Sequence, residues 1–296
     1  MNRLATWQLF ALCVLVWGTT WYAITWQIAE LAPEFGVALR FALAGATILA
    51  FAAWRGERLR FGAREHARFA LQGAFMYGVS YVCVYHAEQH VVSGLVAVGY
   101  SASPLLNMVG MRLFFGTPMT ARVGGGALLG IAGITLVFWP EFSHLNTDRH
   151  VALGAFFTAA SVVLSALSNM AAHRNHDAGL PVWQTMAWGM LYGAIFTLAI
   201  TLALGRPLGF EATPGYVLSL LYLAVFGSVL AFGGFLTLLA RIGAARAGYI
   251  GVMVPIVALA ISSVFEGYRW EWLAIAGIAI SVAGNVIILG KAPARA

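Results

Sequence analysis

The sequence predicts an all-α integral membrane protein with ten transmembrane helices, arranged as two inverted five-helix repeats. The 296-residue chain is 61% hydrophobic and only 9% charged, whereas soluble domains carry about 25% charged residues. Apolar runs of about 20 residues recur along the whole chain, and each is long enough to cross a bilayer core. A third observation is that the stretch 104–138 has a counterpart at 255–289.

The apolar runs divide the chain into ten expected spans joined by short loops. They cover residues 6–28, 35–55, 68–88, 91–114, 120–140, 151–172, 181–204, 215–239, 244–265 and 271–290. The first run is too long for a signal-peptide core and lacks a cleavage-like ending, so we expect it to be a helix of the mature protein. Cys13 and Cys83 fall inside spans, which indicates small apolar fillers rather than a disulfide.

The repeat is carried by prolines and glycines at matching positions. At a shift of 151 residues, Pro104, Gly126 and Gly133 meet Pro255, Gly277 and Gly284; at a shift of 148, Pro33 and Gly45 meet Pro181 and Gly193. The predicted repeats are residues 1–145 and 146–296. Because each holds five spans, an odd number, the second enters the membrane the opposite way round. Inverted repeats are typical of secondary transporters, which bind substrate between the halves and work by alternating access.

The distribution of basic residues predicts the orientation. Of the 17 Lys and Arg residues, thirteen lie at the termini and in the even-numbered loops. They are Arg3, Arg55, Arg58, Arg60, Arg64, Arg68, Arg112, Arg122, Arg174, Arg241, Arg246, Lys291 and Arg295, against Arg149, Arg206 and Arg269 in the odd-numbered loops. Loops rich in Lys and Arg stay cytoplasmic. We therefore expect both termini in the cytoplasm of a bacterium, with the chain in its inner membrane.

Several short motifs resemble one transporter family. Trp17-Gly18-Thr19-Thr20 in the first span, Arg40 in the second and Phe265-Glu266-Gly267 near the end, together with the five-plus-five topology, resemble the EamA-like branch of the drug/metabolite transporter superfamily. The tryptophan-rich first span and the segment 265–268 are most similar to YddG-type exporters of aromatic amino acids. The resemblance implies that transport runs outward. One departure is that Glu266 has no acidic counterpart, since Phe115 stands at the aligned position.

Polar and aromatic residues at helical spacing predict a central aromatic-lined cavity. The expected lining residues are Trp17, Thr20, Tyr77, Tyr81, Tyr100, Ser103, Asn107, Ser165, Trp188, Tyr249 and Met253. Such a wall suits a molecule with an apolar body and a small polar head. The alternative is that the hydroxyls join helices through hydrogen bonds worth about 1 kcal/mol each, an alternative that stays open for the stripe Ser161, Ser165 and Ser168. We expect Tyr85, Trp26 and Trp54 to be interface anchors.

Two prolines are candidates for gating. Pro104 removes the backbone donor that would satisfy the carbonyl of Tyr100, and Pro255 does the same for the carbonyl of Gly251. Freed carbonyls can bind a substrate ammonium. The alternative is a packing kink satisfied by a neighbouring helix.

Three charged candidates lie at or inside span ends. Arg40 can snorkel outward, pair with Glu34 or Glu88, or bind a substrate carboxylate. His86 can carry a proton in transport or be a solvated helix end, and Glu266 is the third. Because all Asp and Glu residues lie at or beyond span ends, no central acid is available for exporting cations, which favours a zwitterionic or neutral substrate.

The sequence thus predicts an exporter of amino acids and related metabolites that is not an enzyme and has no metal, cofactor or nucleic-acid partner. The alternatives are a drug or small-metabolite exporter of the same fold and, less favoured, a membrane-embedded enzyme. The clusters His144, Asp148, His150 and His173, His176, Asp177 are interpreted as solvated loops. The glycines of the fifth and tenth spans mark either a dimer face or packing inside a monomer, which is favoured.

Overall fold

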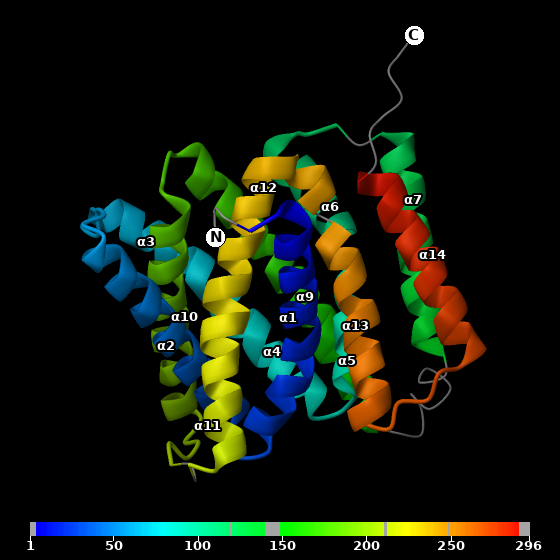
Figure 1. The fold of residues 1–296 in the computed structure, drawn as a ribbon, viewed down its shortest axis with the longest axis horizontal. Coiled ribbons are helices and arrows are strands. Elements are labelled where there is room, and N and C mark those ends of the chain that lie inside the picture. The colour runs from blue at the N-terminus through cyan, green and yellow to red at the C-terminus, as the bar shows by residue number, and fades with distance from the viewer. Residues whose placement is uncertain (1–3, 119, 140–148, 210–211, 248, 290–296) are drawn as a thin grey trace. The chain divides into compact units, whose positions relative to one another are not determined.

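The computed structural model describes residues 4–118, 120–139, 149–209, 212–247 and 249–289, and within these ranges the chain is helical apart from turns and short connections (Figure 1). The first half contains α1 (Thr6–Ile28), α2 (Pro33–Trp54), α3 (Ala63–Gly73), α4 (Ser80–Glu88), α5 (Ser93–Gly99), α6 (Ser103–Phe115) and α7 (Ala121–Val137). The second half contains α9 (Arg149–Asp177), α10 (Val182–Ala203), α11 (Pro214–Leu221), α12 (Ala231–Ala247), α13 (Tyr249–Phe265) and α14 (Trp272–Leu289).

Short irregular turns join some of these helices into longer segments. A π-helical turn, Ala74–Val79, joins α3 to α4, a 3₁₀ turn, Tyr100–Ala102, joins α5 to α6, and a second π-helical segment, Tyr222–Leu230, joins α11 to α12. With these joints counted, the described residues form ten helical segments that match the ten predicted spans, with ends that differ by up to eight residues. The expected all-α membrane fold is therefore confirmed.

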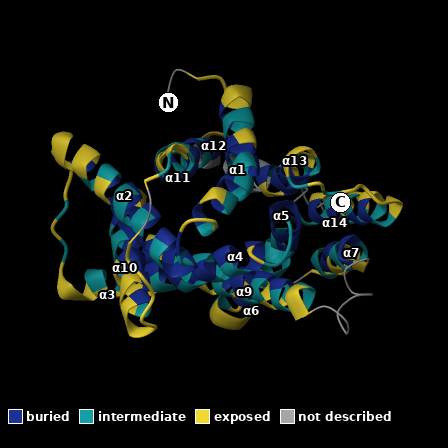
Figure 2. Cartoon of the chain, turned by 90° about the horizontal axis from the view of Figure 1, so that it is seen from below, coloured by how far each residue is buried: buried dark blue, intermediate teal, exposed yellow. Residues whose placement is uncertain are grey.

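The segments have the length and surface of membrane helices. Six are long and apolar enough on their own, and three more are shorter apolar helices. Large apolar side chains such as Leu128 (70% exposed) and Trp272 (74% exposed) stand on their surfaces, and buried and exposed residues alternate around the individual helices (Figure 2). In a membrane the exposed apolar faces meet lipid, so they need no protein cover.

The described helices gather into two compact units that each draw on both halves of the sequence. Unit 1 comprises Met1–Tyr22, Val91–Ala152 and Ala231–Ala296, and unit 2 comprises Ala23–His90 and Leu153–Leu230. This division differs from the predicted repeat boundary at residue 145, which lies outside the described residues and stays a prediction.

In unit 1, α7 and α14 pack backbone against backbone through glycines. A Cβ atom on Gly133 would lie 2.4 Å from the carbonyl oxygen of Gly277, and one on Gly126 would lie 2.7 Å from that of Gly284. The contacts run in opposite directions along the two helices, so these helices are antiparallel. Because Gly126 aligns with Gly277 and Gly133 with Gly284 in the repeat, exchanging the halves reproduces the same contacts, which is the symmetry of inverted repeats.

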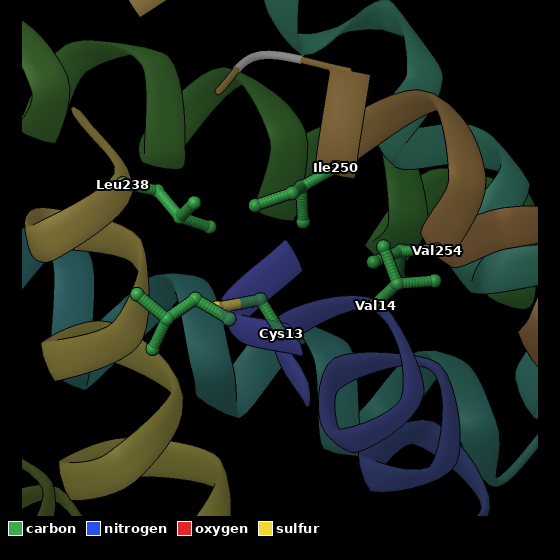
Figure 3. Packing of buried hydrophobic residues seen from close by; sticks show 6 residues of the cluster. Cys13, Val14, Leu238, Ile250 and Val254 are labelled. Atoms are coloured by element: carbon green, nitrogen blue, oxygen red, sulfur yellow. The ribbon is translucent and has the colours of Figure 1, made fainter. Parts of the chain in front are cut away.

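Elsewhere in unit 1, α1 packs against α12 and α13. Leu9, Cys13 and Val14 of α1 form a buried cluster with Leu238, Ile250 and Val254 from α12 and α13 (Figure 3). Gly18, from the motif in the first span, lets Val257 of α13 approach so closely that any side chain there would clash. Cys13 is a buried free thiol, as the sequence indicated.

In unit 2, α2 and α3 pack against α10. Gly45 faces the carbonyl of Ala187, and Gly73 faces the backbone of Gly189. The two π-helical segments of this unit begin at Ala74 and Tyr222, which are separated by the same 148 residues as Pro33 and Pro181. The repeat thus extends to irregular turns, of a kind often found at functional sites.

Candidate functional site

The candidate residues are divided between the two units. Unit 1 holds Trp17, Thr20, Tyr100, Ser103, Pro104, Asn107, Tyr249, Met253, Pro255 and Glu266, and unit 2 holds Arg40, Tyr77, Tyr81, His86, Ser165 and Trp188. Each group is described within its own unit.

The tryptophans of α1 anchor the aromatic group of unit 1. Trp17 is half-buried, and its ring lies 5.2 Å from that of Phe232 and 5.5 Å from that of Phe235. One turn further, Trp21 lies 5.2 Å from the ring of Tyr100. Trp21 was not among the expected residues, although its position four residues after Trp17 puts it on the same helix face. The hydroxyl of Thr20 is buried and donates to the carbonyl of Trp17 at 2.8 Å.

The turn around Pro104 differs from the expected kink. Tyr100–Ala102 is a 3₁₀ turn, and Pro104 lies in the first turn of α6, where a helix needs no backbone donor. The carbonyl of Tyr100 accepts a hydrogen bond from the backbone N–H of Ser103, so the expectation that it is free for a ligand is wrong. Pro255, in contrast, lies inside α13. The two prolines match in sequence but do not occupy equivalent helix positions.

Next to this turn, one buried polar group lacks a partner. The Ser103 hydroxyl is sealed from solvent and makes no hydrogen bond to any described residue. Asn107 lies one turn further along the same helix and is half-buried. On α13, Tyr249 is half-buried and Met253 is 41% exposed.

Glu266 is a structural clamp in unit 1. Its carboxylate accepts hydrogen bonds from the backbone N–H of Ser93 at 3.1 Å and from the hydroxyls of Ser93 and Ser262. The Ser262 hydroxyl also accepts from the backbone N–H of Gly94 at 2.9 Å. The carboxylate therefore satisfies the first turn of α5 and joins it to the end of α13.

The tyrosine stripe of unit 2 faces the protein interior. Tyr77 is 1% exposed and packs on the glycine face of α10, where a Cβ atom on Gly189 would lie 3.3 Å from its ring. Tyr81 is half-buried with its ring edge-on to Phe41 at 4.7 Å. Tyr85, expected at the membrane interface, is fully buried, so that expectation is wrong. Trp26 and Trp54 are 49% and 80% exposed.

Arg40 is the most unusual side chain of unit 2. It is only 2% exposed, so it does not snorkel outward. Its guanidinium carbon lies 4.8 Å from the ring centre of Tyr81 and 5.2 Å from that of Phe41, yet its Nε and Nη1 atoms make no hydrogen bond to any described residue. Ring contacts of this kind contribute about 0.5–2 kcal/mol, whereas burying an ion costs several kcal/mol. The rings alone do not offset the burial.

His86 and Glu34 form a partly buried pair in unit 2. His86 Nε2 lies 2.8 Å from Glu34 Oε1, and Nδ1 lies 3.1 Å from Gln89 Oε1. Each ring nitrogen of His86 thus has an oxygen neighbour. The His86 side chain is 20% exposed, and its role in transport stays a prediction.

The acidic residues of this region are deeper than their helix positions suggested. Glu34 and Glu88 stand at the ends of α2 and α4, as the sequence placed them, but they are only 2% and 7% exposed. The Tyr85 side chain interacts electrostatically with both Arg40 and Glu88. Unit 2 thus buries charge of both signs, which in a membrane protein marks a functional region.

The remaining candidates of unit 2 lie on α9 and α10. The hydroxyls of Ser161 and Ser168 bond carbonyls of their own helix, and Ser80 Oγ donates to the carbonyl of Ser161 at 2.9 Å. These bonds favour packing for the serine stripe, in which Ser165 is half-buried.

Trp188 belongs to an aromatic group at the junction of α3 and α10. It stands edge-on to His66 at 4.8 Å, and Tyr192 Oη lies 3.0 Å from His66 Nδ1. Its indole N–H is buried and has no partner among the described residues. Neither His66 nor Tyr192 was expected, although Tyr192 follows Trp188 by one helical turn.

Of the two clusters considered for an enzyme, the second lies at the end of α9 and not in a loop. His173 Nε2 and Asp177 Oδ2 are 3.5 Å apart on the surface of α9. His144 and Asp148 lie outside the described residues. Within the described parts of the chain, no three His, Cys, Asp or Glu side chains gather closely enough to hold a metal ion.

The chain is similar in sequence to several known proteins. The chain is 29% identical over 297 aligned residues to the uncharacterized inner membrane transporter YedA of Escherichia coli K12, covering 96% of this chain and 90% of that protein. It is 24% identical to the protein PecM of Dickeya dadantii, covering 97% and 92%, and 21% identical to the protein PagO of Salmonella typhimurium, covering 90% and 87%.

A solved crystal structure shares the fold with a TM-score of 0.69 at 18% identity, over 95% of this chain and 94% of that one. The model of the EamA-like transporter family matches the chain twice, at residues 5–139 and 152–290. With helices throughout and two matches that cover most of the sequence, the chain belongs to the EamA-like transporter family.

Proposed function

We propose that this membrane transporter exports amino acids, aromatic or otherwise largely apolar, and related metabolites across the inner membrane of a bacterium by alternating access. One observation carries the proposal. Buried polar groups without partners, the Ser103 hydroxyl and the Trp188 indole N–H, occur in neighbourhoods rich in aromatic rings. Unsatisfied buried polar groups call for a partner. A substrate with an apolar body and a small polar head supplies one.

The second candidate is a drug or other small-metabolite exporter of the same fold. The exposed Met253 and the aromatic rings around Trp17 favour it, since flexible and aromatic surfaces accept varied apolar molecules. A membrane-embedded enzyme is less favoured. Such an enzyme needs several catalytic groups clustered at one depth of the membrane, and the candidate residues do not form such a cluster.

The test is uptake of labelled phenylalanine, threonine and lysine into proteoliposomes, with and without a pH gradient. We expect saturable uptake, with phenylalanine preferred because its ring matches the aromatic surroundings. Uptake of none of the three would reject amino-acid transport and favour the drug or metabolite alternative. A need for the gradient would direct attention to the pair His86 and Glu34.

A further inference from the structure

We propose that Arg40 is an anion site that binds the carboxylate of the transported molecule. The proposal rests on the proposed function and specifies which group receives the polar head of the substrate. It starts from a guanidinium that is buried to 98% yet leaves two of its three nitrogens without a hydrogen bond to any described residue.

The surroundings of Arg40 hold the guanidinium in place but satisfy it only in part, through an interaction with the Tyr85 side chain. Phe41 offers no acceptor, and the centre of the Tyr81 ring lies 4.8 Å from the guanidinium carbon. Contact with a ring face leaves the N–H groups at the edge of the planar guanidinium available. Those groups form a rigid fork that matches the two oxygens of a carboxylate.

The acids of this region are engaged by other side chains. Glu34 directs one oxygen to His86 at 2.8 Å, while Glu88 shares an electrostatic contact with the Tyr85 side chain, which also interacts with Arg40. Arg206, at the exposed surface, also acts electrostatically on Glu34, so the cations Arg40 and Arg206 balance the anions Glu34 and Glu88.

This balance restricts the chemistry of the substrate. A simple carboxylate would add an uncompensated negative charge to a buried region, which is costly in low dielectric. A zwitterion brings its own ammonium and leaves the region neutral. The geometry therefore points to α-amino acids, whose carboxylate binds Arg40.

The experiment measures ligand-dependent thermal stabilisation of the purified full-length protein. The ligands are phenylalanine, phenylalaninamide (an uncharged amide in place of the carboxylate), 2-phenylethylamine (no carboxylate) and 3-phenylpropionate (no ammonium). The proteins are wild type, Arg40→Gln, Arg40→Lys and the control Arg55→Gln, which changes an arginine at the exposed end of the same helix.

In the wild type we expect phenylalanine to bind at least about tenfold more tightly than phenylalaninamide and 2-phenylethylamine, the loss expected for a hydrogen bond to a charged group. Arg40→Gln should abolish this preference by weakening phenylalanine alone, Arg40→Lys should retain part of it, and Arg55→Gln should behave as wild type.

Equal binding of phenylalanine and its amide by the wild type would overturn the proposal, and this readout needs no folded variant. Equal weakening of all ligands by Arg40→Gln would also overturn it, because a structural role predicts that pattern. Binding of 3-phenylpropionate but not phenylalanine would leave the anion site standing while rejecting the amino-acid function and the zwitterion argument.

Discussion

At the scale of single residues, Glu266 illustrates a charged side chain that serves the fold. Its carboxylate accepts hydrogen bonds from Ser93 at the start of α5 and from Ser262 near the end of α13. We expect Glu266→Gln to lower the free energy of unfolding by about 1–3 kcal/mol, because an amide accepts with one oxygen and carries no charge. Thermal unfolding in detergent measures this, with Glu271→Gln as the control at an exposed site nearby. An unchanged melting temperature together with altered substrate preference would instead place Glu266 in the transport site.

A substitution of Tyr77 distinguishes a packing role from a substrate-binding role. It is buried against the glycine face of α10. We expect Tyr77→Ala to destabilise the protein by about 3–5 kcal/mol, the range for removing a large aromatic side chain from a core. The measurement is thermal unfolding beside uptake per folded molecule. Normal stability with lost uptake would support the cavity-lining role that the sequence predicts.

The sequence located these residues better than it located their neighbours. The spacing of Tyr77, Tyr81 and Tyr85 predicted one helix face, yet not that Tyr85 is buried beside Arg40. Likewise the sequence correctly predicted that Glu34 and Glu88 lie at helix ends. It did not predict their burial, because that burial depends on helices distant in sequence. Helical periodicity shows which residues share a face, whereas the partner of that face is set by tertiary packing.

At the scale of helices, the glycines of α7 and α14 explain how two spans approach so closely. A Cβ on Gly133 would lie 2.4 Å from the backbone of Gly277, while a Cβ on Gly124 would meet nothing within 4 Å. We expect Gly133→Ala to destabilise by about 1–3 kcal/mol through overpacking. Gly124→Ala, on the same helix, should be neutral or stabilising by up to about 1 kcal/mol.

Unfolding and oligomeric state, measured together, check this pair of variants. If Gly133→Ala kept the stability of the monomer but dissociated a dimer, the glycine face would belong to a dimer contact. The sequence left both roles open, and the contacts between Gly126 and Gly284 and between Gly133 and Gly277 favour packing within one chain.

Helix existence was predictable, and local irregularity was not. All ten spans followed from apolar length alone. The π-helical segments at Ala74–Val79 and Tyr222–Leu230 had no recognised signal, because a widened turn keeps the apolar composition of a regular helix. At Tyr222–Leu230, Ser228 Oγ bonds the carbonyl of Leu223, five residues earlier, at 2.9 Å, which illustrates how a side chain supports such a turn.

At the scale of the whole molecule, the inverted repeat and the positions of the arginines make one joint prediction about topology. Ten spans place both termini on the same side, and the excess of Lys and Arg in the terminal and even-numbered segments predicts that this side is cytoplasmic. The antiparallel glycine contacts of α7 and α14 agree with this, since repeat-equivalent helices must cross in opposite directions.

We therefore expect a fluorescent protein fused after Ala296 to fluoresce and an alkaline phosphatase fused there to be inactive, because the former folds in the cytoplasm and the latter requires the periplasm. Fusions truncated after Thr117 should behave in the same way, since that loop follows four spans. Fusions truncated after Arg206, which follows seven spans, should show the reverse pattern. Phosphatase activity at the C-terminus with the other two sites as expected would contradict the ten-span topology. A reversal at all three sites would retain ten spans and overturn only the orientation inferred from the arginines.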